Sequence, residues 1–212
     1  MKKYLVEFIG TFFLVMTIGM TVIEPGAGAM APLAIGSALM IMVYAGGHVS
    51  GGHYNPAVTL AVWLRGKCPT SDVVPYWTSQ ILGSLLASFV VLTLKHYPTV
   101  YPMDMSQHAG YLSALLAEFI GTFALAYVVL NVATAKATAG NSFYGLAIGF
   151  TVMVMAYGLG SISGGAFNVA VATAATVMHI VKATDFWIYL IGNFGGAAVA
   201  AMTFKFINPE DK

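Results

Sequence analysis

The fold of this chain is constrained most by an internal repeat. Glu-Phe-Ile-Gly-Thr-Phe at residues 7–12 recurs at 118–123, and Ser-Gly-Gly at 50–52 recurs at 163–165. The first pair is separated by 111 residues and the second by 113, so the copies keep nearly the same register. Self-similarity of this kind marks a structural unit that is used more than once. We therefore predict two similar halves.

Each copy of the repeated loop leads into a short apolar run. The loops end in Asn55 and Asn168, and the side chain of asparagine is well suited to cap the N-terminus of a helix. The runs that follow, near 56–65 and 169–180, are only about three turns long, whereas a helix needs roughly 20 residues to cross a bilayer. We expect two half-helices that enter the membrane and return to the same side.

The composition places the chain in a membrane. Apolar residues make up 58% of its 212 residues and charged residues only 8%, which is too few charges for the surface of a water-soluble domain. Besides the half-helices, six stretches are long and apolar enough to span a bilayer: 4–23, 32–49, 73–94, 112–134, 143–160 and 185–207. The predicted fold class is all-α and integral to the membrane, with six transmembrane helices and two re-entrant half-helices in an inverted repeat. These form a single domain, 1–212, with repeats at about 1–105 and 106–212.

The number of spans and the positive charges together predict the orientation. Three spans per half is an odd number, so the second copy enters from the opposite side and the half-helices meet near the midplane. With the N-terminus inside, Lys95 and Lys182 lie outside, and both termini are cytoplasmic. Such an excess of positive charge inside follows the positive-inside rule; the cytoplasmic set is Lys2, Lys3, Arg65, Lys67, Lys136, Lys205 and Lys212.

This geometry predicts what the midplane does. Irregular backbone survives at membrane depth only where it is buried in protein or lines a wet cavity, because lipid cannot satisfy its carbonyls. We therefore expect the loop residues to line a path, with both half-helix N-termini and the amides of Asn55 and Asn168 directed at it. Neutral hydrogen-bonding solutes can pass such a centre, whereas cations are opposed. The predicted lining residues of the loops are Gly51, Gly52, His53 and Gly164.

The segment 47–59, Gly-His-Val-Ser-Gly-Gly-His-Tyr-Asn-Pro-Ala-Val-Thr, carries a resemblance to a known family. In a duplicated six-span chain it resembles the aquaporins, or major intrinsic proteins, and the likeness covers nearly the whole sequence. The resemblance implies a pore through each subunit and a homotetramer. It also implies that the two Asn-Pro-Ala positions form the pore midplane: Asn55, Pro56, Ala57, Asn168, Val169 and Ala170.

Two departures from the family pattern concern selectivity. The second signature reads Asn-Val-Ala, with Val169 where proline is usual, and we expect looser packing against Pro56. Three residues after Asn168, Val171 stands where water-selective members usually carry an arginine. By the family's register, the constriction ring is Ile35, Ala156, Gly165 and Val171. Such a ring has no cation and no side-chain donor, and we expect it to be wide and apolar.

Several polar residues near the loops have two readings. Glu7 and Glu118 lie inside spans, where an acidic side chain is a candidate for function, such as a proton relay. Because they occupy equivalent positions in the two repeats, we favour a structural role in which they accept hydrogen bonds from N–H groups of the loops. His48 and His53 flank the first loop. Either could sense pH, but packing of the loop is the commoner role, and we assign His48 to the bracing set with the two glutamates.

The sequence thus favours a passive channel for water and small uncharged solutes such as ammonia, urea or glycerol. A transporter coupled to an ion gradient, or a gated or non-conducting structural member of the family, stays open. We expect no enzymatic activity, because no catalytic triad or nucleotide fingerprint is present, and no cofactor or metal; the single cysteine, Cys68, excludes a disulfide within the chain. The expected partners are water, small neutral solutes, the lipid bilayer and further copies of the chain, not nucleic acid. The short loops are compatible with the plasma membrane of a microbe.

Overall fold

Six long helices and two half-helices make up most of the computed structural model, which describes residues 1–211. The predicted fold class is confirmed, since the described chain is all-helical apart from one isolated β-bridge between Met103 and Val181. The long helices are α1 (Lys2–Val22), α2 (Ala31–Ser50), α4 (Thr70–Leu94), α6 (Tyr111–Val129), α7 (Tyr144–Ser163) and α9 (Phe186–Ile207). The half-helices are α3 (Pro56–Leu64) and α8 (Val169–Val177), close to the predicted runs.

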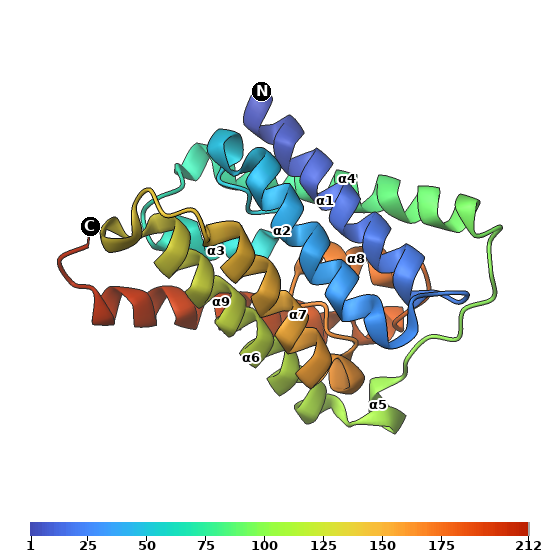
Figure 1. Ribbon diagram of the computed structural model, residues 1–212. Helices are drawn as coiled ribbons and strands as arrows, with labels where there is room; N and C mark the ends of the chain where they lie inside the picture. The colour runs from blue at the N-terminus through green and yellow to red at the C-terminus, as the bar shows by residue number, and fades with distance from the viewer. Residues whose placement is uncertain (212) are drawn as a thin grey trace.

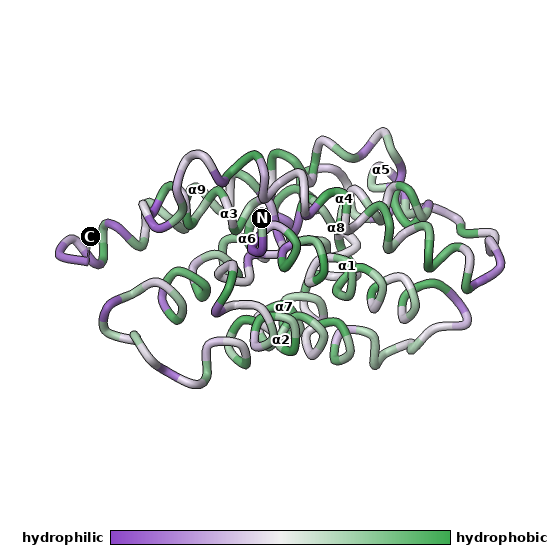
Figure 2. Tube along the Cα trace, turned by 90° about the horizontal axis from the view of Figure 1, so that it is seen from above, coloured by the Kyte–Doolittle hydropathy of each residue, from purple (hydrophilic) through white to green (hydrophobic). Residues whose placement is uncertain are grey.

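All six long helices are long and apolar enough to cross a membrane. Hydrophobic residues predominate along their middle portions, and the hydrophilic segments collect toward the two ends of the bundle (Figure 2). This distribution is expected for a chain whose helix surfaces face lipid. Many large apolar side chains are exposed on those surfaces, among them Leu112, Phe89 and Ile191.

The helices pack as two similar halves. In the first half α1 contacts both α2 and α4, and in the second α6 contacts both α7 and α9, while α2 and α7 join the halves. Both chain ends lie at one end of the bundle (Figure 1), and we call this the terminal side and the opposite end the distal side. Residue Lys212, one of the predicted cytoplasmic charges, lies outside the described residues.

The half-helices enter from opposite ends and cross into each other's half. α3 packs on α9, and α8 packs on α4. Each half-helix therefore contacts a long helix from the other repeat, as well as the long helix that follows it in its own repeat, α4 for α3 and α9 for α8. This exchange brings α3 and α8 into contact, and hydrogen bonds join the residues just before their first turns.

Short elements in the connections were not predicted from the sequence. A four-residue helix, α5 (Met105–His108), lies in the segment that joins the halves. The span predicted at 112–134 ends as α6 at Val129 and continues as a π-helical turn, η2 (Leu130–Thr134). Single 3₁₀ turns occupy the remaining connections: η1 (Gly28–Met30), η3 (Lys136–Thr138) and η4 (Ala183–Asp185).

Candidate functional site

The two repeated loops adopt the same backbone conformation. Gly51, with φ 90°, caps the C-terminus of α2, and Gly164, with φ 84°, caps that of α7. The next glycines, Gly52 and Gly165, both have φ 64°. These left-handed angles cost little for glycine and much more for other residues, which explains why the Gly-Gly pair recurs in both copies.

Each asparagine caps its own half-helix and reaches across to the other loop. The Asn55 Oδ1 accepts from the backbone N–H of Ala57 at 2.8 Å, while its Nδ2 donates to the Phe167 carbonyl at 2.8 Å. Asn168 repeats this arrangement, accepting from Ala170 at 2.9 Å and donating to the Tyr54 carbonyl at 2.9 Å. An amide nitrogen carries two N–H groups, so each asparagine retains one donor beyond the bond that joins the loops.

The buried carboxylate of Glu7 collects donors from the first loop. Its Oε1 accepts from the Ser50 hydroxyl at 2.7 Å and from the His53 backbone N–H at 3.0 Å. Its Oε2 accepts from the Tyr54 backbone N–H at 2.6 Å and from the Gln80 amide at 2.7 Å. Four hydrogen bonds thus tie the loop and α4 to one side chain of α1.

Glu118 makes the equivalent contacts in the second half. Its Oε1 accepts from the Ser163 hydroxyl at 2.7 Å and from the Ala166 N–H at 2.9 Å, and its Oε2 accepts from the Phe167 N–H at 2.7 Å. The amide of Asn193 is oriented by its neighbours, donating to Glu118 at 2.9 Å and accepting from the Asn168 N–H at 3.0 Å. Both glutamates therefore act as hydrogen-bond centres that fix the loop backbone.

Two further pairs of residues support the loops and were not singled out from the sequence. Tyr76 donates to the Ser50 carbonyl at 2.7 Å, and Tyr189 donates to the Ser163 carbonyl at 2.6 Å. Gln80 and Asn193 form the second pair, each with its amide on a bracing glutamate. Both pairs follow the same 113-residue spacing as the loops, and that spacing is the signal that would have found them.

Glycines of the repeated segment on α1 and α6 make room for the loop aromatics. A Cβ at Gly10 would lie 2.1 Å from the Tyr54 ring, and a Cβ at Gly121 would lie 2.2 Å from the Phe167 ring. Tyr54 and Phe167 themselves have φ 48° and are almost completely buried. Each ring is thus inserted against a helix backbone, and this packing holds the loops in their strained conformation.

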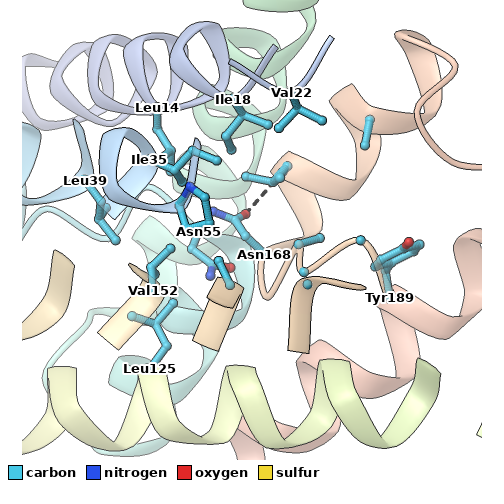
Figure 3. A pocket seen from close by; sticks show the side chains of 18 of the residues that line it. Leu14, Ile18, Val22, Ile35, Leu39, Asn55, Leu125, Val152, Asn168 and Tyr189 are labelled. Carbon is cyan, nitrogen blue, oxygen red and sulfur yellow. Dashed lines mark hydrogen bonds between the residues drawn. The ribbon is translucent and has the colours of Figure 1, made fainter. Parts of the chain in front are cut away.

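A cavity of about 280 Å³ contains the paired asparagines. In Figure 3, Asn55 and Asn168 lie next to each other, with apolar side chains from α1, α2, α6 and α7 around them. The lining is therefore mostly hydrocarbon, with the two amides at its centre. The apolar side chains labelled around this cavity are Leu14, Ile18, Val22, Ile35, Leu39, Leu125 and Val152.

The predicted site residues divide between the cavity wall and the packing behind it. Asn55 and Asn168 line the cavity, whereas the other four midplane residues are buried and do not: Pro56, Ala57, Val169 and Ala170. The four predicted ring residues all line it: Ile35, Ala156, Gly165 and Val171. Of the predicted loop lining, Gly52, His53 and Gly164 also border this cavity.

A second cavity of about 420 Å³ opens on the terminal side. Gly51, the remaining loop residue, lines it, together with His53, which borders both cavities. Its wall is more polar than that of the first cavity and includes Lys67, Asp72 and Thr134. Among the described residues, no group of three or more metal-ligating side chains is placed to hold a metal ion.

His48 does not take part in the bracing. Its side chain is exposed near the end of α2, and no hydrogen bond joins it to the loop in the described part of the chain. Helical geometry explains the difference, because Ser50 is buried and bonded to Glu7 while His48, two residues earlier, lies on another face of the helix. We correct the prediction and restrict the bracing set to Glu7 and Glu118.

The distal mouth of the first cavity is bordered by Met103 from the segment that joins the halves. The Met103 N–H donates to the Ile180 carbonyl at 2.9 Å, and the Met105 N–H donates to the buried carboxylate of Asp185 at 3.0 Å. An ion pair between Asp104 and Lys182 closes the same contact. These interactions clamp the joining segment onto the connection after α8.

This clamp should persist over most of the pH range. The Lys182 ammonium, with help from Ser106, lowers the pKa of Asp104 to about 2. A carboxyl whose pKa falls on folding stabilises the fold above its ordinary pKa of 3.8 and loses that effect as pH falls toward 2. We expect amide-exchange protection factors of Met103 and Met105 to stay level from neutral pH to about pH 4.

The matching variant is Lys182→Ala. Because an exposed ion pair contributes little, we expect only a several-fold loss of protection at Met103 and Met105. Protection in α9 should stay unchanged and serves as the internal control. Unchanged protection at Met103 in the variant would show that the backbone contacts alone hold the clamp.

Six membrane-length helices, two half-helices joined at their capped ends and a central cavity between them define the class of protein: a membrane channel. A model of the major intrinsic protein family matches residues 1–204. The chain belongs to that family and is a multi-pass membrane protein, a passive channel for water and small solutes rather than an enzyme.

Individual relatives match over nearly the full length. Aquaporin AqpM of Methanothermobacter thermautotrophicus is 34% identical over 242 residues, which cover 99% of this chain and 98% of the relative. Aquaporin NIP1-4 of Oryza sativa subsp. japonica is 34% identical over 215 residues, with 98% of this chain and 77% of the relative covered. The aquaglyceroporin structure from Plasmodium falciparum shares the fold with a TM-score of 0.81 at 20% identity, covering 99% and 97% of the two chains.

Proposed function

We propose that this channel conducts water together with small uncharged solutes such as ammonia, urea or glycerol. The observation that carries the proposal is the chemistry of the predicted ring. Ile35, Ala156, Gly165 and Val171 all border the cavity, and none of them has a charge or a side-chain hydrogen-bond donor. A ring without an arginine is wider and less polar than a filter for water alone, and it favours neutral solutes with some hydrocarbon surface.

The centre of the pathway supplies selectivity against cations in this proposal. The N-termini of α3 and α8 carry partial positive charge, and the asparagines add N–H donors beside them. A neutral solute can accept a hydrogen bond there, whereas a cation meets a positive field without a compensating anion. The carboxylates of Glu7 and Glu118 cannot serve as that compensating anion, because they already accept hydrogen bonds from the loops.

The terminal side is proposed to face the cytoplasm. Six of the seven positive residues of the cytoplasmic set lie within the described chain, in or beside the terminal ends of the helices. Lys95 and Lys182 lie in the distal connections, which fits the positive-inside rule. We further propose a homotetramer, one pore per subunit, repeats that meet near residue 105, and the plasma membrane of a microbe as the location.

A transporter coupled to protons is less well supported. Such a protein needs an ionisable group that can gain and lose its proton beside the solute. Glu7 accepts four hydrogen bonds from the protein itself, and Glu118 accepts three besides the Asn193 amide. Neither side chain lines the cavities, so both serve better as structural acceptors.

Stopped-flow light scattering on proteoliposomes tests the proposal. Water flux is measured with an impermeant osmolyte, solute flux with inward gradients of urea and glycerol, and ammonia and proton flux with an internal pH dye. We expect water flux well above empty liposomes, uptake of at least one neutral solute and no proton conductance. The absence of all flux would favour a gated or non-conducting protein, and uptake that follows a proton gradient would favour a transporter.

A further inference from the structure

Two cavities of the molecule share two lining side chains. The first contains the asparagines and the ring, and the second opens on the terminal side. Within residues 1–211, only His53 and Val129 line both cavities. The imidazole of His53 and the isopropyl group of Val129 therefore lie where the two cavities adjoin, and we call this pair of side chains the neck.

One face of α6 and of the turn that follows it borders both cavities in succession. Leu125 lines the first cavity, Val129 lines both, and Ala133 in the π-helical turn lines the second. These residues follow one another at intervals of four, so they lie along one face of the helix. Val129 is thus the residue of that face that borders both the central cavity and the terminal one.

The imidazole of His53 cannot easily move out of the way. Its Nδ1 lies 3.1 Å from the Thr59 hydroxyl, and its backbone N–H is held by Glu7. The ring packs against Tyr76, with 5.1 Å between ring centroids, and Tyr76 is itself bonded to the Ser50 carbonyl. The side chain is 8% exposed, which makes it a rigid wall rather than a mobile flap.

Val129 is similarly restricted. It is 5% exposed and belongs to the buried core. A branched Cβ leaves valine few rotamers in a helix, so its two methyl groups project at a fixed position. A neck formed by two rigid side chains has a fixed width, and width discriminates among solutes of different size.

The neck has no equivalent in the second repeat. Ala166 occupies in the second loop the position that His53 occupies in the first. Ala166 lines the first cavity on the distal side, where a methyl group replaces an imidazole. The distal half also carries the ring, in which two of the four residues, Gly165 and Ala156, have small side chains.

We infer that size selection in this channel occurs at the neck of His53 and Val129, on the terminal side of the asparagines, and not at the ring of Ile35, Ala156, Gly165 and Val171. The inference rests on the proposed function in that it assigns a filter for the neutral solutes named there. It predicts that solutes such as urea and glycerol are limited by contact with Val129, while water passes beside it with less hindrance.

The test compares valine substitutions at the neck and in the buried core away from both cavities. Val129→Ala should widen the neck and raise the ratio of urea or glycerol permeability to water permeability by roughly tenfold, the scale on which a methylene-sized change discriminates substrates. Val129→Leu should lower the same ratio. The matched control is Val91→Ala, a fully buried valine of α4 that lines neither cavity and should leave the ratio unchanged.

The outcomes separate the neck from the proposed solute range. Equal effects of Val129→Ala and Val91→Ala on the permeability ratio, or no change of that ratio in either Val129 variant, would overturn the neck. If Val129→Ala misfolds and gives no water flux, Val129→Leu is the test, because it should lower the ratio of urea or glycerol permeability to water permeability. A wild-type protein that passes water alone would refute the proposed solutes, while urea flux gained in Val129→Ala would still support the neck.

Discussion

Replacement of Glu118 with alanine is expected to abolish water flux and to remove most of the stability of the folded channel. The substitution deletes the acceptor of the Ser163 hydroxyl and of the backbone N–H groups of Ala166 and Phe167. All three donors lie in or beside a loop at membrane depth, where no lipid group can replace the lost acceptor. Each buried unsatisfied donor costs about 1–3 kcal/mol, so the total approaches the roughly 5–15 kcal/mol of a typical fold.

The measurement is the thermal unfolding midpoint of the purified protein in detergent, followed by water flux per reconstituted protein. Glu210→Ala, in the exposed tail, removes an equal charge from a site without packing and should change neither quantity. Glu118→Gln should be intermediate, because the amide keeps one oxygen acceptor but turns an NH₂ group toward the Phe167 N–H. Normal folding and water flux in Glu118→Ala would contradict the bracing role.

The helices that could be predicted from the sequence are those whose positions depend on local composition and capping residues. The six spans needed only length and apolar composition, and the ends observed for α1, α2 and α9 lie within about three residues of the predicted ones. The half-helices were found because asparagine caps and apolar runs too short to span a bilayer recur in both copies. The inverted packing was predicted because each half has three spans, an odd number, so the second copy must enter the membrane from the opposite side.

The features that the sequence did not reveal depend on contacts between distant residues. The α5 helix forms where the joining segment meets Asp185, 80 residues away, and nothing in its own four residues requires a helix. The neck joins a loop residue, His53, to a helix residue, Val129, and no local pattern relates the two. His48 was misassigned because the motif around it suggested loop packing, whereas the helix turns its side chain outward.

Replacement of Val171 with arginine is expected to suppress urea, glycerol and ammonia flux much more than water flux. Val171 lies in the first turn of α8, where its N–H is 3.4 Å from the capping Asn168 oxygen, and it lines the cavity. An arginine there would place a long cationic side chain with five N–H donors into a lining that is now hydrocarbon. Water can hydrogen-bond to that group while it passes, whereas larger solutes no longer fit beside it. We expect the flux of these solutes to fall by roughly tenfold or more.

A neutral variant separates the size of the new side chain from its charge. Val171→Met extends to a similar depth without a cation, so it should reduce solute flux but leave any leak of cations or protons as in the wild type. Val171→Arg should show no leak either, because a fixed positive charge opposes cations. A larger fall of solute flux with arginine than with methionine would be the effect of the charge and its N–H donors. Fluxes are measured in the same proteoliposomes, with the internal pH dye for ammonia and protons. If Val171→Arg lowered all fluxes equally, or none, the side chain at 171 would not face the solute path, and the assignment of the ring would be wrong.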